Sequence, residues 1–248
     1  MKIKDTYENV TPYKNSTLSK KLQVIKIFNS ISDVYDIVNK ILFFGLHSLW
    51  REKVVKILIS KKPIKILDIA TGTADLAIDL LETKAKEIIG LDISEDMINV
   101  GKQKVNAKGL SDRIKIEIGD AENLKFQDNY FDAITCSFGV RNFDNLNKAL
   151  GEINRILKPN GTFIVLETSN PQNFPFKQGH YIYIKYVVPL IGGLFSKDKY
   201  AYKYLSKSLI KFPSGIDFNN ILDKIGFINI ENIPQTFGAT TIYVANKK

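Results

Sequence analysis

Short β-rich runs alternate with helical segments along most of the chain, and this alternation restricts the fold more than any other feature. The β-rich runs lie at residues 64–69, 87–93, 113–119, 131–138, 162–168, 226–232 and 241–247. Strands that alternate with helices predict right-handed crossovers and an open, mostly parallel sheet. We therefore predict a doubly wound α/β fold with seven strands, helices on both faces of the sheet, and an antiparallel closing pair.

The N-terminal quarter of the chain has a helical pattern instead. From Leu18 to Ser60 apolar residues recur at helical spacing, with interruptions near Ser32 and Gly45. The chain has no internal repeat and no Pro/Gly/Ser-rich linker, so its 248 residues predict one large domain with a helical extension. The expected parts are a helical extension over residues 1–60, an α/β domain over residues 61–248 and, within it, a helical insertion over residues 171–213.

Polar motifs follow four of the predicted strands at their carboxyl ends, where sheets of this kind bind ligands. The first motif is LDIATGTADLA, residues 67–77, in which Gly72 serves either close approach to a ligand or only a tight turn. The motif lacks a GxGxxG fingerprint, and Asp68 and Asp75 flank it. Carboxylates repel a pyrophosphate but attract a ligand that carries an ammonium and a sulfonium, such as S-adenosylmethionine.

The other three motifs supply acceptors for a nucleoside. Asp92 ends the second strand, where it can accept both ribose hydroxyls; its alternative role, helix capping, is already filled by Ser94. Asp120 can accept an adenine amino group while the Ala121 N–H donates to the ring, and the alternative is a plain Asx turn. Ser137 lies beneath the predicted ligand, unless it is only a hydroxyl of the core.

Charge and composition leave the partner open. A net charge of +9 permits an anionic lipid surface, nucleic acid or a merely solvated surface. The single cysteine, Cys136, lies in an apolar run, which favours a buried structural thiol over a nucleophile. No window reaches the roughly 18 apolar residues of a spanning helix, and the polar N-terminus carries no cleavage signal. We expect a cytoplasmic protein.

The chain resembles known methyltransferases in several motifs. DIATGTADL, GLDIS, GDAENLKF and RILKPNGTFIVLE resemble the Rossmann-like class I S-adenosylmethionine-dependent methyltransferases. A closer resemblance, to the demethylmenaquinone and ubiquinone C-methyltransferases, covers nearly the whole chain. It rests on FNSISDVYDIVNKILFFGLHSLWR (28–51), SFGVRNF (137–143), LETSNP (166–171), YAYKYLSKSLIKFP (200–213) and LDKIGF (222–227).

This resemblance implies transfer of a methyl group from S-adenosylmethionine to the ring of a polyprenyl quinol, foremost demethylmenaquinol, without a metal. A benzoquinol of the ubiquinone pathway is the main alternative. Less favoured alternatives are methylation of RNA or of another lipid, and a non-catalytic role in binding an adenosyl ligand. The family has a glycine where this chain has Ala74, which could narrow the turn slightly. The implied cofactor contacts are Thr73, Asp92, Asp120, Ala121 and Ser137.

Three residues are candidates for the chemistry. Arg141, in FGVRN, would stabilise the phenolate form of the quinol, because a permanent cation lowers the pKa of a nearby phenol. Its alternative role is a structural ion pair with Asp144 or Glu167. Tyr35 and His47 belong to the N-terminal block, which the resemblance predicts to close over the cofactor as a lid. His47 would accept a proton, or only pack, and Tyr35 would hydrogen-bond or stack.

A hydrophobic stretch from Phe174 to Phe195 is the candidate for contact with the isoprenoid tail. Aromatic residues alternate there with Lys177, His180 and Lys185, which suits a membrane interface as well as an ordinary core helix. The expected partners are therefore a polyprenyl quinol and the inner face of the cytoplasmic membrane, with no nucleic acid. A homodimer is compatible with the sequence.

Overall fold

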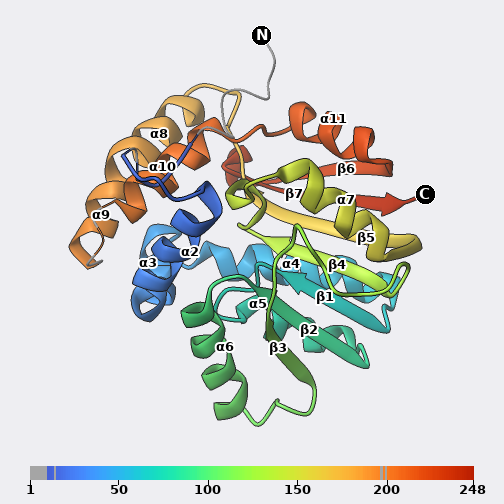
Figure 1. The fold of residues 1–248 in the computed structure, drawn as a ribbon. Helices are drawn as coiled ribbons and strands as arrows, with labels where there is room; N and C mark the ends of the chain where they lie inside the picture. The colour runs from blue at the N-terminus through green and yellow to red at the C-terminus, as the bar shows by residue number, and fades with distance from the viewer. Residues whose placement is uncertain (1–9, 14, 196–197, 199) are drawn as a thin grey trace.

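Seven strands form one sheet in the part of the chain that the computed structural model describes, residues 10–13, 15–195, 198 and 200–248. Their order is β3-β2-β1-β4-β5-β7-β6; the first five strands run parallel, and β7 is antiparallel to β5 and β6 (Figure 1). This confirms the predicted sheet and its closing pair. The strands are β1 (Lys65–Ile69), β2 (Glu87–Asp92), β3 (Ile114–Ile118), β4 (Phe131–Ser137), β5 (Leu157–Thr168), β6 (Phe227–Gln235) and β7 (Thr240–Lys247).

Two predicted regions are only partly described. Residues 1–9 and 14 of the extension over 1–60 lie outside the described residues, as do 196, 197 and 199 within the insertion over 171–213. The described helices are α2 (Lys20–Ile31), α3 (Tyr35–Leu42), α4 (Leu46–Lys61), α5 (Asp75–Asp79), α6 (Glu95–Ala107), α7 (Leu146–Ile156), α8 (Phe176–Ile182), α9 (Val188–Phe195), α10 (Ala201–Lys211) and α11 (Ile216–Ile225). Short helical turns are η1 (Ser32–Val34), η2 (Leu80–Thr83), η3 (Val140–Asn142), η4 (Tyr183–Val187) and η5 (Thr236–Gly238).

Strand β5 begins five residues earlier than we predicted. The sequence indicated a strand from residue 162, but β5 starts at Leu157, which pairs with Phe131 before the register shifts. Leu157 is fully buried, whereas Pro159 and Asn160 after it are not, and Asn160 has a φ of 63°. The KPNG segment therefore interrupts the apolar pattern of the strand without ending its pairing, and this interruption concealed the true start.

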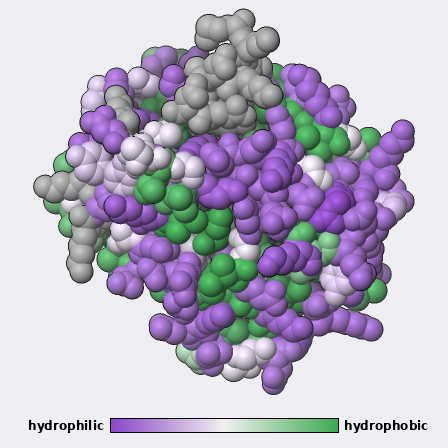
Figure 2. Space-filling view, viewed as in Figure 1, coloured by the Kyte–Doolittle hydropathy of each residue, from purple (hydrophilic) through white to green (hydrophobic). Residues whose placement is uncertain are grey.

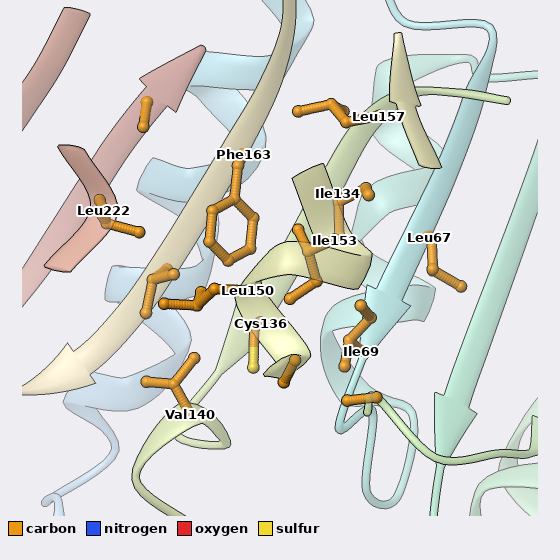
Figure 3. Close-up of a cluster of buried hydrophobic side chains, with 14 of the residues drawn as sticks. Leu67, Ile69, Ile134, Cys136, Val140, Leu150, Ile153, Leu157, Phe163 and Leu222 are labelled. Atoms are coloured by element: carbon orange, nitrogen blue, oxygen red, sulfur yellow. The ribbon is translucent and has the colours of Figure 1, made fainter. Parts of the chain in front are cut away.

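Helices cover both faces of the sheet, as predicted. On one face α7 and α11 bury Leu150, Ile153 and Leu222 against Phe163 and its neighbours (Figure 3). On the other face α4, α5 and α6 bury a second cluster that includes Leu58. Cys136 of β4 is fully buried in the first cluster, and burial raises the pKa of its thiol, which confirms a structural cysteine.

A third apolar cluster joins the N-terminal helices to the insertion. Ile27, Ile31 and Val38 of α2 and α3 pack with Tyr202 and Leu205 of α10. These helices gather beside the end of the sheet to which the parallel strands point, opposite the C-terminus (Figure 1). The sheet thus has two covered faces and, in addition, a covered carboxyl edge.

The segment α8–η4–α9 is one helical stretch with a π-helical turn in its middle, and it lies along α10. The Ser206 hydroxyl of α10 donates a 2.6 Å hydrogen bond to the Ile184 carbonyl within that turn. Further along, Gly192 of α9 lies directly against Tyr202: a Cβ at Gly192 would lie 1.9 Å from Cγ of that ring. Among the described residues, no helix is both long and apolar enough to span a membrane.

The contact between Gly192 and Tyr202 yields a stability prediction. We expect Gly192→Ala to lower the free energy of unfolding by about 1–3 kcal/mol in urea denaturation, because the methyl group cannot fit without moving α9 or the ring. Gly193→Ala is the matched control, since no described atom outside its immediate surroundings lies within 4 Å of a Cβ there. That variant should gain about 0.5–1 kcal/mol from helix propensity. Equal effects in the two variants would refute the packing argument.

Candidate active site

Two adjoining cavities open at the carboxyl ends of the parallel strands. Their volumes are about 710 and 560 Å³, open space at their mouths included. Because the two share part of their lining, they form one site between the edge of the sheet and the N-terminal helices. The shared lining residues are Tyr35, Ala70, Gly72, Ser137 and Phe138.

The structure brings the seven predicted cofactor residues together in this site. The larger cavity is lined by Gly72, Asp92, Asp120, Ala121 and Ser137. The smaller cavity adds Asp68 and Thr73. Tyr35 lines both cavities and His47 lines the smaller one, whereas Arg141 lies outside the lining of both, beside its lining neighbour Asn142. Their roles toward the cofactor stay predictions.

Asp92 connects the first turn to the second strand. Its carboxylate accepts hydrogen bonds from the Gly72 N–H at 2.8 Å and from the Ser94 N–H at 2.9 Å. Ser94 caps α6, as predicted, by accepting from the Met97 N–H at 3.3 Å. Burial raises the pKa of Asp92, opposed by these backbone donors. Each carboxylate oxygen still has acceptor capacity, so ribose hydroxyls could bind alongside the backbone N–H groups.

Asp120 makes the Asx turn that we considered and also an ion pair that we did not foresee. Its Oδ1 accepts from the Glu122 N–H at 2.9 Å, and its Oδ2 lies 2.7 Å from Lys21 Nζ. Lys21, on α2, also pairs with Glu122 at 3.0 Å. No local signal in the sequence identifies Lys21, because its partners lie about 100 residues away and meet it only in the folded chain. The lining of the larger cavity also includes apolar side chains suited to a flat base: Val24, Phe28, Ile93, Met97 and Phe143.

Asp68 is the buried carboxylate of the smaller cavity. It accepts 2.7 Å hydrogen bonds from the hydroxyls of Thr71 and Thr135. Burial raises its pKa to about 6, despite these donors and the nearby positive charge of Arg51. A raised pKa means that the site would favour a cation close to this carboxylate, since the cation would stabilise the ionised form. The acidic lining therefore fits a ligand with an ammonium or sulfonium group.

Thr73 belongs to a polar network that ties the N-terminal helices to this turn. Its hydroxyl donates to Asp36 Oδ1 at 2.6 Å and accepts from Lys104 Nζ at 3.0 Å. Lys104 also pairs with Asp36 and Asp75, each at 2.6 Å. Elements α3, α5 and α6 thus meet at one ammonium group. Neither Asp36 nor Lys104 was predicted from the sequence, because each belongs to an ordinary amphipathic helical pattern.

Arg141 makes one of the two ion pairs that we considered for it. Its Nη1 lies 2.6 Å from Glu167 Oε1 and donates to the Phe138 carbonyl at 2.7 Å. Both side chains are buried, yet Arg141 Nε and Glu167 Oε2 have no hydrogen-bond partner among the described residues. Burial raises the pKa of Tyr35, whereas the charge of Arg141 lowers it. Arg141 and Tyr35 are therefore close enough to interact electrostatically.

His47 and two tyrosines complete the polar groups near the site. Burial and the charge of Arg51 lower the pKa of His47, and no described residue is hydrogen-bonded to its Nδ1. Its imidazole is therefore neutral near pH 7. From α10, the Tyr204 hydroxyl donates to Asn142 Oδ1 at 3.2 Å, and the Tyr202 hydroxyl has no partner in the described structure. We did not predict these tyrosines, because in sequence they read as the apolar face of a helix.

Comparison with known proteins gives close relatives over nearly the whole chain. A model of the ubiE/COQ5 methyltransferase family matches residues 16–247. A demethylmenaquinone methyltransferase of Bacteroides fragilis is 42% identical over 241 residues, which cover 97% of this chain and 98% of that protein. A demethylmenaquinone methyltransferase of Bacillus cereus is 39% identical over 231 residues, covering 92% and 97%. These matches extend over the N-terminal helices and the insertion as well as the sheet.

Solved structures with low sequence identity share the fold. An S-adenosylmethionine-dependent methyltransferase from Thermotoga maritima has a TM-score of 0.63 at 20% identity, covering 91% of this chain and 100% of the other. Another from Aquifex aeolicus has a TM-score of 0.58 at 17% identity, covering 80% and 89%. The likeness confirms the predicted Rossmann-like methyltransferase fold.

The buried carboxyl of Asp68 yields a prediction for cofactor affinity. Since its pKa in the free protein is about 6, the carboxyl is protonated at pH 5 and ionised at pH 7.5. A bound cation favours ionisation and returns the pKa toward about 4, so affinity for S-adenosylmethionine should fall about tenfold from pH 7.5 to pH 5. Calorimetric titration at both pH values measures this.

Asp68→Asn should bind more weakly at pH 7.5 and should lose most of that pH dependence. The control is Asp223→Asn, which removes an exposed carboxylate on α11 and should retain the full dependence. A pH dependence that is the same in Asp68→Asn and in the unmodified chain would remove Asp68 from cofactor recognition.

Proposed function

The chain belongs to the ubiE/COQ5 methyltransferase family, and from this premise we propose that it methylates a ring carbon of demethylmenaquinol, with S-adenosylmethionine as the methyl donor. The observation that carries the proposal is the 42% identity to a demethylmenaquinone methyltransferase over nearly the full length of both proteins. Such identity includes the N-terminal helices that line the site and the insertion that packs against them. The names of the relatives favour a naphthoquinol over a benzoquinol.

The reaction forms a bond between the ring carbon and the methyl group and breaks the bond between that methyl group and sulfur. Bound S-adenosylmethionine supplies the methyl group on a sulfonium, a good leaving group. The chain has to hold the ring carbon in line with that bond, and positioning of this kind supplies up to about 7–11 kcal/mol. It must also ionise the neighbouring phenol and accept the proton that the ring carbon loses.

Arg141 is our candidate for ionising the phenol. Phenols have a pKa near 10, and a cation within about 4–6 Å lowers such a pKa by 1–3 units. Glu167 fixes Arg141 through Nη1, which leaves Nε without a partner among the described residues. Because Arg141 lies beside the cavity and not in its lining, it would act on the phenolate through its charge or through a bridging water molecule. Arg141 acts electrostatically, because its own pKa is too high for it to be a base.

Tyr35 and His47 are our candidates for orienting the quinol and accepting its proton. Tyr35 lies where the two cavities meet and interacts with Arg141, so it suits hydrogen bonding or stacking on the ring. His47 lies in the smaller cavity with a lowered pKa, so it is neutral and able to accept a proton at pH 7. The tail of a polyprenyl quinol partitions into lipid, and we therefore also propose contact with the inner face of the cytoplasmic membrane.

The proposal is tested by incubating the purified chain with labelled S-adenosylmethionine and a demethylmenaquinol reduced in situ. We expect a methylated naphthoquinone after reoxidation, identified by mass spectrometry. Parallel reactions with a demethylated benzoquinol and with RNA are the controls for the alternatives. Cofactor binding without transfer to any quinol would contradict the proposal in favour of a non-catalytic adenosyl-binding protein.

The role of Arg141 yields a prediction for the pH dependence of turnover. Arg141→Met should lower kcat at pH 7.5 roughly tenfold to thousandfold, and the rate should recover toward high pH as the phenol ionises unaided. Arg141→Lys keeps a cation beside Glu167 and should keep a profile closer to that of the unmodified chain. Arg155→Met is the matched control, because Arg155 is also ion-paired, with Asp128 at 2.7 Å and Glu152 at 2.8 Å, but lines neither cavity. If Arg141 is purely structural, Arg141→Met should behave as Arg155→Met does, with a lower free energy of unfolding and an unshifted pH profile of kcat.

A further inference from the structure

The helical stretch α8–η4–α9 exposes an unusual number of large apolar side chains. Ile184 and Val188 face the interior, but most of the remaining bulky residues face outward. The exposed ones are Phe174 (just before α8), Phe176, Tyr181, Ile182, Tyr186, Leu190, Leu194 and Phe195. Soluble monomers rarely expose an apolar patch of this extent without a binding role. In the view of Figure 2 the surface is mainly hydrophilic, with interrupted hydrophobic patches, and α8 and α9 lie toward its left edge.

Two exposed phenylalanines from distant parts of the chain extend the same surface. The ring of Phe44 lies 6.2 Å from that of Tyr183, and the ring of Phe237 stacks on that of Phe176 at 4.0 Å. Phe44 is 77% exposed and Phe237 73% exposed. Both have a left-handed backbone, with φ of 51° and 57°, which is rare for bulky residues. The chain thus adopts an unfavourable conformation twice, and each time an apolar ring projects from this surface into water.

The same part of the sequence carries most of the net positive charge of the chain. Between residues 168 and 216 the sequence has seven lysines and one acidic residue, Asp198, so a net charge of +6 lies here within a chain total of +9. Three of these lysines lie at intervals of four on α10 and are exposed: Lys203, Lys207 and Lys211. Two more, Lys177 and Lys185, are exposed among the aromatic residues. Lys185 Nζ lies 5.2 Å from the ring centres of both Tyr181 and Tyr186.

We propose that this surface, formed by α8–η4–α9, α10, Phe44 and Phe237, docks on an anionic lipid bilayer. The choice of a membrane as the partner rests on the proposed polyprenyl substrate. The positive charge and the exposed apolar side chains identify the surface that would bind it. Aromatic and aliphatic side chains enter the interfacial region, while lysines extend their charged ends to anionic headgroups. Docking places α9 and α10, which pack against the site-lining helices α3 and α2, next to the phase that holds the quinol.

Charge and composition favour the bilayer over two other occupants. A second copy of the chain would bring a surface with five described lysines and one described acidic residue against its equal, which is repulsive unless acidic groups intervene. RNA would account for the lysines but not for Ile182, Leu190, Leu194 and Phe195, which offer nothing to a phosphate backbone. An anionic bilayer complements the positive charge and the apolar side chains together. Each lysine near such a surface strengthens binding roughly fivefold.

The test is co-sedimentation of the full chain with vesicles of phosphatidylcholine alone or with 30% phosphatidylglycerol. We expect binding to the anionic vesicles that weakens with salt. K203Q/K207Q/K211Q should lose about a hundredfold in affinity. The control K102Q/K108Q/K115Q, with three exposed lysines on α6, just after it and on β3, should lose less than fivefold. L190S/L194S should lose at least tenfold. Its control is I64S/I228S, with two exposed apolar residues at the amino ends of the parallel strands, which should bind normally.

Turnover of a quinol without a tail separates this proposal from the proposed function. L190S/L194S should methylate a water-soluble demethylated naphthoquinol at the normal rate and lose turnover only with vesicle-embedded substrate. Methylation of the soluble quinol without vesicle binding would overturn docking and leave the function intact. Vesicle binding without any quinol methylation would overturn the function instead. A dimer that L190S/L194S abolishes, or RNA binding that only the lysine variants lose, would also overturn docking.

Discussion

The apolar cluster between the N-terminal helices and α10 covers the edge of the sheet at which the candidate site lies. Parallel strands leave their polar carboxyl ends at a common edge, and in this chain Ile27, Ile31 and Val38 close that edge against Tyr202 and Leu205. Without the cluster the edge would be an open groove filled with water. At this edge the carboxyl of Asp68 is buried enough for its pKa to reach about 6, and the pair Arg141–Glu167 is desolvated.

At this edge single residues combine an observed structural role with the functional role that we propose for them. Asp92 holds two backbone N–H groups and keeps acceptor capacity. Asp120 forms a local turn and faces the larger cavity. Arg141 makes a structural ion pair and retains a buried N–H without a partner among the described residues. For each residue the sequence was compatible with a structural role or with a role toward the ligand, and the geometry is compatible with both roles together.

Features encoded over a few residues could be predicted from the sequence, whereas those that depend on folding could not. The strands followed from their apolar runs, and the cap of α6 followed from Ser94 before Glu95 and Asp96. The predicted cofactor residues follow strands, so topology alone gathers them. Lys21 and Lys104 could not be predicted, because their partners lie on other elements. The predicted start of β5 was wrong because Pro159 and Gly161 interrupt the strand pattern in the sequence, whereas Leu157 before them pairs with Phe131 of β4.

The π-helical turn Tyr183–Val187 makes the length of its segment matter more than its composition. Each residue of a helix rotates the following side chains by about 100°, and a π turn accommodates an additional residue within an α-helix. Removing one residue there would regularise the helix and swing Gly192 away from Tyr202. A bulkier side chain would then contact that ring, and a different set of α9 residues would face outward. Related chains should therefore tolerate exchange of side chains in this turn far better than a single-residue deletion.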